Sequence, residues 1–320
     1  MKKALTACVV SALSLVALQG CIVQSETERF REAVPKGDEV KTGVPGASGS
    51  GKSGSSSLRI ATGTGSGSAK YYEFTREITW GTDTVTGVIL AAVKAVSDEQ
   101  PTTIESKKAV WGPWSGSALE PVTWRFTVTE GATDEFDYVL EGKPRNGADS
   151  EYKSVLRGKG YGKSNAAYRT GNFSVDNDAF RALDPAHGKD DGSVKVTYDL
   201  KNLEKRNIKV ELRLGGTKGK ADIDVQHAAG GAGTLNIVAE TDLDAAKSTK
   251  AENITVASRW NTAGAGRADI TLQGGDVASA GVVKASECWS TSFSRVYYSD
   301  SVSSEPTSGD PAACAFTAAK

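Results

Sequence analysis

Histidine is scarce in this sequence, and neither sign of charge dominates. The chain has only two histidines, His187 and His227, and neither is spaced for a shared metal ion, so no histidine-rich metal centre is expected. The 38 Lys+Arg residues are balanced by 39 Asp+Glu residues, which excludes the strongly basic composition of nucleic-acid binders. With 38% hydrophobic and 24% charged residues, the composition is that of a globular protein and excludes wholesale disorder and a polytopic membrane protein.

Motifs for nucleotide binding and catalysis are absent or misplaced. The formal phosphate-loop match, Gly46–Ser53, lies in a Gly/Ser-rich stretch, whereas phosphate binding needs a strand-to-helix junction. No G-x-S-x-G motif occurs. The paired carboxylates Asp222 and Asp224 share one face of an expected strand, which is typical of the wet side of a sheet. We therefore expect no enzyme, no cofactor, no metal site, and no nucleotide or nucleic-acid partner.

The N-terminus carries the features of a secretory signal. Met1–Lys3 is basic, and Ala4–Leu18 follows as an uncharged run that is short for a membrane span. The run ends in Leu18-Gln19-Gly20-Cys21, which resembles the lipobox of bacterial lipoproteins. The resemblance implies cleavage before the cysteine, so residues 1–20 are expected to be a signal peptide that is removed.

Lipidation at Cys21 is the second implication of that resemblance. In this class the new N-terminal cysteine carries a diacylglycerol, and its amine usually carries a further acyl chain such as palmitate. Each buried CH2 contributes roughly 0.8 kcal/mol, so two or three chains hold a protein on a membrane almost permanently. Ile22 stands where some bacteria place an Asp that resembles an inner-membrane retention signal. The outer membrane is therefore the expected location, and its periplasmic and surface faces both stay open.

The use of cysteine agrees with export. Cys8 leaves with the signal and Cys21 is lipidated, so Cys288 and Cys314 remain as an even pair in an oxidising compartment. We expect a disulfide between them that staples the C-terminal tail. Two buried free thiols are the alternative.

A polar segment over residues 21–57 separates the cysteine from the rest of the chain. It ends in a Gly/Ser-rich stretch, and such a segment cannot bury enough apolar surface to offset its ordering entropy. We expect a flexible tether with a root-mean-square reach of about 30 Å, followed by a single domain over residues 58–320.

Alternation of apolar and polar residues dominates that domain. In Val122–Thr129, large apolar side chains alternate with threonine and arginine. The same period recurs in the segments 136–140, 194–200, 208–214, 223–225, 235–237, 254–256 and 268–272. A period of two predicts antiparallel strands with one solvated face. We expect an all-β domain with about twelve strands in one meander, the last strand falling over residues 288–298.

Two stretches follow the helical period instead. Apolar residues at helical spacing, with Pro101 beyond them, predict a helix near 83–97. A short helix is expected near 176–184, stopped by Pro185. A one-faced sheet must cover its apolar face, so we expect a large curved antiparallel sheet around the longer helix, or a barrel plugged by it. A two-sheet sandwich is the next alternative.

Two of the six tryptophans, Trp111 and Trp114, flank a Gly-Pro pair. Exposed indoles there could contact a ligand, whereas buried ones would plug the end of the β core. We expect a lipid-anchored envelope protein with a non-catalytic binding or assembly role and an envelope protein as partner. The alternative is a periplasmic carrier that holds a hydrophobic or lipid ligand on the apolar concave face of the sheet, an expectation based on similarity of architecture alone.

Overall fold

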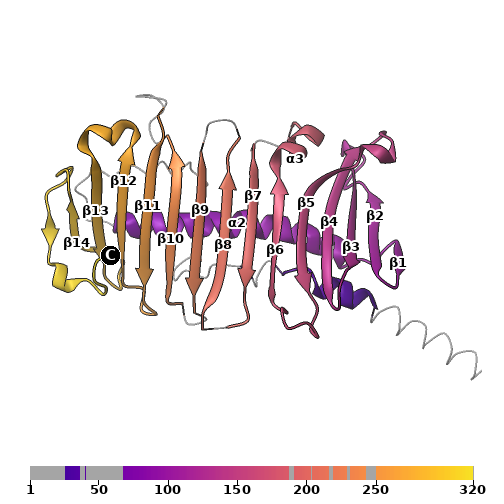
Figure 1. Cartoon of the computed structure of the whole chain (residues 1–320), viewed down its shortest axis with the longest axis horizontal. Helices are drawn as coiled ribbons and strands as arrows, with labels where there is room; N and C mark the ends of the chain where they lie inside the picture. Colours follow the sequence, from indigo (N-terminus) through magenta and orange to yellow (C-terminus); the bar gives the residue numbers. More distant parts are fainter. Residues whose placement is uncertain are drawn as a thin grey trace, which may run out of the picture.

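The body of the protein is one open antiparallel sheet that covers a long helix (Figure 1). The computed structural model describes residues 26–36, 40, 68–186, 191–202, 204–215, 219–228, 231–242 and 250–319. Within these residues, fifteen strands pair only with their neighbours in chain order, from β1 to β15. The expected all-β meander is therefore confirmed, with more strands than the dozen predicted.

The strands follow one another along the chain with short connections. Their bounds are β1 Thr103–Glu105, β2 Lys108–Trp114, β3 Val122–Glu130, β4 Glu135–Pro144, β5 Lys153–Tyr161, β6 Thr170–Asp176, β7 Ser193–Asp199, β8 Arg206–Arg213, β9 Lys220–His227, β10 Gly233–Thr241, β11 Glu252–Trp260, β12 Gly266–Gly274, β13 Val282–Trp289, β14 Arg295–Asp300 and β15 Ser308–Gly309. Every apolar–polar alternating segment of the sequence overlaps one of these strands, although the segments 194–200 and 208–214 each run one residue past the end of β7 or β8. The sheet does not close, and its short edge strands β1 and β15 offer few unpaired backbone groups to other chains.

The alternation of the sequence is visible in the burial of each strand. Along β7, every second side chain is buried and the others are exposed. The outer face carries cross-strand ion pairs: Lys195 Nζ lies 2.8 Å from a Glu211 carboxylate oxygen, and Arg213 lies 2.7 Å from Asp222. One face of the sheet is therefore dry and the other is wet, as the period of two predicts.

Helix α2 (Lys70–Ser97) covers the dry face. Its 28 residues make it about 42 Å long, and it runs across the strands behind the sheet in Figure 1. Helix α2 contacts β12, β13 and β3. Tyr71, Tyr72, Leu90 and Val93 are buried against the sheet, and burying a side chain of this size contributes about 1.5–3 kcal/mol.

The helix begins thirteen residues before the predicted start at Asp83. The buried positions of the extra turns include Thr75 and Thr79, which interrupt the apolar stripe that marks a helix in the sequence. Their hydroxyls bond inside the fold instead: Thr75 Oγ1 lies 2.8 Å from Ser258 Oγ on β11 and 2.7 Å from the Tyr71 carbonyl. The prediction of a curved sheet around a helix is confirmed, and the start of that helix is corrected.

Helix α3 (Asn177–Leu183) is the second predicted helix. Its N-cap is Asp176, whose side chain accepts a 2.8 Å hydrogen bond from the Ala179 amide. Phe180 of α3 stacks on Trp124 with ring centroids 6.0 Å apart. With Val122, Val155 and Leu183, these rings form a small second apolar cluster.

Residues 26–36 correct the prediction of a flexible tether. Residues 26–32 are helical, and Phe30, Ala33 and Val34 are buried in the main core. The Phe30 ring meets Phe136 edge-on at 5.8 Å, and the Ala33 carbonyl oxygen occupies the place where Gly160 would carry a Cβ. The remainder of the expected tether lies outside the described residues, apart from the buried Val40.

The C-terminal end of the sheet differs in one detail from the prediction. The expected final strand over 288–298 is two strands, because the chain turns between β13 and β14 at residues 290–294. The predicted disulfide between Cys288 and Cys314 is present. Cys288 is fully buried on β13, so the bond holds the tail to the sheet.

Candidate functional site

A buried carboxylate holds the N-terminus of α2. Glu287 projects from β13 towards the helix, is fully buried, and accepts a hydrogen bond from the Tyr71 amide. The N-cap residue, Ala69, offers no side-chain acceptor of its own. A carboxylate at this end satisfies a helix amide and complements the positive end of the helix dipole. Glu287 is therefore a cap supplied from a strand 216 positions away in sequence.

Three further charged side chains surround Glu287. Arg295 Nε donates to Glu287 at 2.5 Å, and its Nη1 lies 2.7 Å from Glu305 Oε2. Lys70 Nζ lies 3.1 Å from the second oxygen of Glu305. We call Lys70, Glu287, Arg295 and Glu305 the ionic cluster. It joins the start of α2, two strands and the C-terminal segment.

Burial and hydrogen bonding have opposite effects on the pKa values of the two carboxyl groups in the ionic cluster. Burial raises the pKa of Glu287 above its usual value, although bonds from the Tyr71 amide and Arg295 oppose the rise. Burial also acts on Glu305, but bonds from Arg295 and Lys70 outweigh it and lower its pKa. The surroundings of the cluster thus disfavour the ionised form of Glu287 and favour that of Glu305.

A tyrosine–aspartate pair adjoins the ionic cluster. The Tyr298 hydroxyl donates to Asp300 Oδ2 at 2.9 Å, and the Arg295 guanidinium lies 4.6 Å from the centre of the Tyr298 ring. Burial raises the pKa of Tyr298. Burial would also raise that of Asp300, but bonds from Ser304, Tyr298 and the Glu305 amide outweigh it and lower the Asp300 pKa.

The opposite end of α2 is held by a cation. The Arg31 guanidinium donates to three carbonyl oxygens at the end of the helix, those of Ser97, Asp98 at 2.9 Å and Glu99 at 2.8 Å. These carbonyls carry the negative end of the helix dipole. An acid from β13 and a base from the N-terminal segment therefore fasten the two ends of one helix.

Polar residues at dry-face positions are the feature of the sequence that could have indicated these buried polar contacts. Glu252 and Ser258 on β11, and Glu287 on β13, stand where the alternation calls for apolar side chains. Each meets a polar partner inside: Glu252 accepts from the Asp276 amide at 2.7 Å, and Ser258 bonds to Thr75. Buried polar groups need such partners, so a break in the alternation marks a fastening point.

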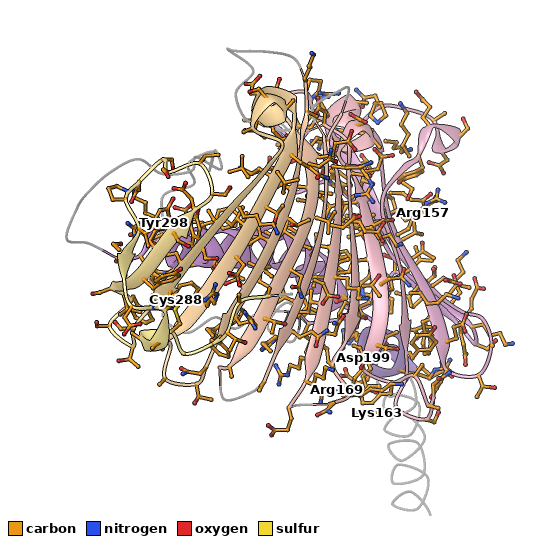
Figure 2. The ribbon with its side chains drawn as sticks, turned by 60° about the vertical axis from the view of Figure 1, so that its left-hand side comes forward. Arg157, Lys163, Arg169, Asp199, Cys288 and Tyr298 are labelled. Atoms are coloured by element: carbon orange, nitrogen blue, oxygen red, sulfur yellow. A yellow bond between two sulfur atoms is a disulfide. The ribbon has the colours of Figure 1, made fainter. Side chains whose placement is uncertain are left out.

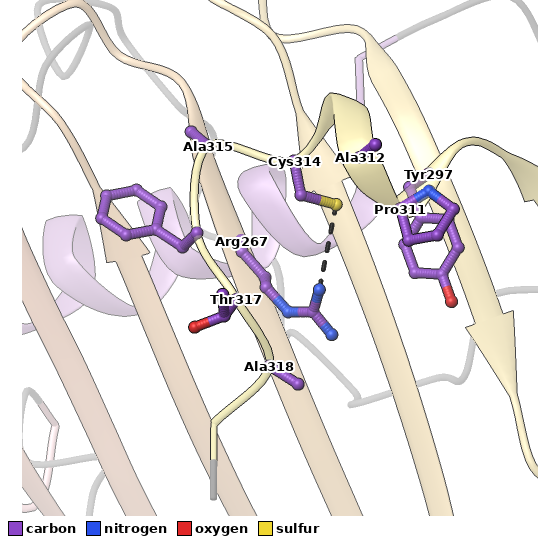
Figure 3. Close-up of a pocket in the computed structure, with 9 residues that line it drawn as sticks. Arg267, Tyr297, Pro311, Ala312, Cys314, Ala315, Thr317 and Ala318 are labelled. Carbon is purple, nitrogen blue, oxygen red and sulfur yellow. Dashed lines mark hydrogen bonds between the residues drawn. The ribbon is translucent and has the colours of Figure 1, made fainter.

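A pocket of about 550 Å³ lies under the C-terminal tail (Figure 3). Its lining consists of tail residues, among them Cys314, Phe316 and Thr317, together with the Tyr297 ring and one cation, Arg267. Arg267 Nε lies 2.9 Å from Asp269 Oδ1, its Nη2 lies 3.1 Å from Ser286 Oγ, and its Nη1 points at the disulfide. The guanidinium is thus largely neutralised by Asp269, and it holds the tail.

Asp269 connects the sheet to the last residues of the chain. Burial would raise its pKa, but bonds from Arg267, Ser286 and the Ala319 amide outweigh it and lower the pKa. The Ala319 amide lies 2.9 Å from Asp269 Oδ2. Nearby, Arg259 donates to the carbonyl oxygen of Thr317. The charges around the pocket therefore fix the tail on the outer face.

The tryptophans singled out from the sequence are not a pair of exposed indoles. Trp111 is buried, its Nε1 donates to the Glu99 carbonyl at 2.9 Å, and its ring packs 5.6 Å from Phe126. Trp114 is half-buried and packs against the main core. Of the two roles left open, plugging the end of the β core is the one that describes Trp111.

The fold does not bring the other candidate site residues from the sequence together into one site. Cys21 and His187 fall outside the described residues. His227 is buried at the end of β9. Asp224 accepts a 2.9 Å bond from Asn207, and Asp222 pairs with Arg213. Among the residues that the structure describes, no three potential ligands gather closely enough to hold a metal ion.

Comparison with known proteins gives no relative. No family model, curated protein or solved structure matches the chain. Over the described ranges, no helix combines the length and the apolar character that crossing a bilayer requires.

Proposed function

We propose that this protein is a lipid-anchored protein of the bacterial cell envelope with a non-catalytic binding or assembly role. The observation that carries the proposal is the lipobox-like Leu18-Gln19-Gly20-Cys21, which stands only a few residues before a segment that is part of the folded body. Acylation of Cys21 would tie that body to a membrane, and Ile22 favours the outer membrane. An envelope protein is the expected partner.

The contacts of the buried charged groups support a scaffold, meaning a protein with the non-catalytic binding or assembly role proposed above. Perturbed pKa values often mark active sites, but here the perturbed and buried groups have mechanical tasks. Glu287 and Arg295 fasten α2, and Asp269 fastens the tail. These contacts support a scaffold role, in which the part of the wet face that the tail leaves uncovered is the surface for protein contacts.

The position of α2 weighs against the carrier alternative. A hydrophobic ligand on the dry face would occupy the space where Tyr72, Leu90 and Val93 are buried. The carrier therefore requires α2 to leave the sheet and its two end caps to break. We favour the scaffold for this reason.

Membrane fractionation tests the anchor. In the native host, we expect the wild-type protein in the membrane fraction and Cys21→Ser in the soluble fraction or retained uncleaved at the inner membrane. Cys8→Ser is the matched control, because it changes a cysteine of the expected signal peptide and should fractionate as wild type. A Cys21→Ser protein that is processed and fractionates as wild type would overturn the proposal.

A further inference from the structure

Several side-chain contacts hold the segment that follows the expected lipid site against the sheet. Arg29 lies 3.0 Å from the Glu130 carboxylate and donates to the Ser106 carbonyl at 2.8 Å. Glu32 pairs with Lys163. Together with the buried Phe30, these contacts attach the segment from residue 26 onward to the sheet.

The sheet partners of Arg29 and Glu32 lie on one rim of the sheet. In an antiparallel meander, every second turn falls on the same side. Ser106 lies between β1 and β2, Glu130 ends β3, and Lys163 lies between β5 and β6. Figure 2 shows Lys163 beside Arg169 and Asp199 at this end of the strands. We call the β1–β2, β3–β4, β5–β6 and β7–β8 turns the near rim.

The chain between the lipid site and the near rim is short. Four residues separate Cys21 from Glu26, so the five intervening steps span at most about 18 Å. The opposite rim is farther by the length of a nine-residue strand such as β3, which is about 30 Å. An anchor at Cys21 therefore cannot let the body tumble freely, as a tether of residues 21–57 would.

The two rims also differ in charge, and the difference favours the near rim as the one that faces an anionic membrane. The described residues of the four near-rim turns include the basic Lys107, Lys163, Arg169, Lys201 and Lys205 against the acidic Asp134 and Glu204, and Lys163 is already paired with Glu32. On the opposite rim, the described residues of α3 and its flanks include Asp176, Asp178, Asp184 and Asp191 against Arg181. An anionic lipid surface attracts the first set and repels the second.

We propose that the near rim rests on the lipid surface and that the strands rise from it, so that the opposite rim is the end a partner reaches. This inference rests on lipidation of Cys21. It follows from the fixed attachment of residues 26–36 and the short chain before them. The protein would thus contact the bilayer in two ways, through the inserted acyl chains and through the near rim of the folded body.

Fluorescence quenching in vesicles tests this orientation. The full-length lipidated protein is reconstituted into phosphatidylethanolamine/phosphatidylglycerol vesicles that contain a headgroup-attached nitroxide. Single thiol labels are placed at Ala166→Cys on the near rim and Ala118→Cys on the opposite rim, two exposed alanines. The wild-type cysteines do not interfere, because Cys288 and Cys314 are paired and Cys21 would be acylated. We expect several-fold stronger quenching of the label at residue 166.

Two other results would be informative. Equal quenching at both positions, on protein whose Cys21 carries lipid, overturns the orientation and leaves the anchor intact. Absence of lipid on Cys21, with no binding to vesicles, overturns the anchor and the orientation together. A long Gly/Ser spacer inserted between Val23 and Gln24 should remove the difference between the two labels, and a difference that persists contradicts the role of the short chain.

Discussion

Removal of the Glu287 carboxylate should destabilise the protein more than removal of any exposed acid. In Glu287→Ala, the Tyr71 amide loses its acceptor, and Arg295 loses one of its two carboxylate partners and keeps Glu305. Deleting one partner of a buried pair costs about 3–5 kcal/mol. Arg295 is 23% exposed and is partly solvated, and the burial that raises the Glu287 pKa already offsets part of the gain. We therefore expect a loss near the lower limit, about 3 kcal/mol.

Urea unfolding of the protein, followed by circular dichroism and tryptophan fluorescence, measures this loss. Glu211→Ala is the matched control, because Glu211 makes an ion pair on the outer face with 40% of its side chain exposed, and such pairs contribute about 0–1 kcal/mol. Glu287→Gln keeps an oxygen for the Tyr71 amide and should fall between the two. If Glu287→Ala unfolds at the same urea concentration as Glu211→Ala, the ionic cluster does not fasten α2.

Three further outcomes are expected. Cys314→Ser opens a bridge with a sequence separation of 26, so unfolding free energy should fall by about 3.5 kcal/mol and the tail should become sensitive to protease; an unchanged digestion pattern would refute this. Phe30→Ala should lower the free energy of unfolding by about 3–5 kcal/mol, because Phe30 is fully buried. In a free tether the same substitution would cause no loss measurable by urea unfolding. Because hydrogen bonds lower the pKa values of Asp269 and Asp300, the stability they contribute is present above about pH 4 and is lost as the pH falls below it. Urea midpoints across this range should show a shallower decline in Asp300→Asn than in wild type, and parallel curves would contradict the assignment.

The sheet was predictable because its signal is repeated along the whole chain. A strand wetted on one side needs an apolar residue at every second position, and segments such as Val122–Thr129 show this directly. Helix α3 was also predictable, since an Asp before it and Pro185 after it act locally. The strand count was too low because β1 and β15 have three and two residues, which is too short for a period to appear, and because the expected final strand over 288–298 is divided between β13 and β14.

The remaining features depend on contacts between distant residues. Phe30, Ala33 and Val34 have helical spacing, but the charged residues around them give the segment the average composition of a tether. The first turns of α2 lack a continuous apolar stripe because Thr75 bonds to Ser258 across the interface. Glu287 is visible in the sequence only as a misplaced acid in an alternating strand, and its partner at the start of α2 is 216 positions away.

The mass of the N-terminal peptide of the mature protein, purified from membranes of its native host, tests the central claim most directly. The account predicts a peptide that begins at Cys21 and carries the added mass of a diacylglycerol and an amide-linked acyl chain. A peptide that begins at another residue, or an unmodified Cys21, would contradict the membrane anchor and the orientation derived from it.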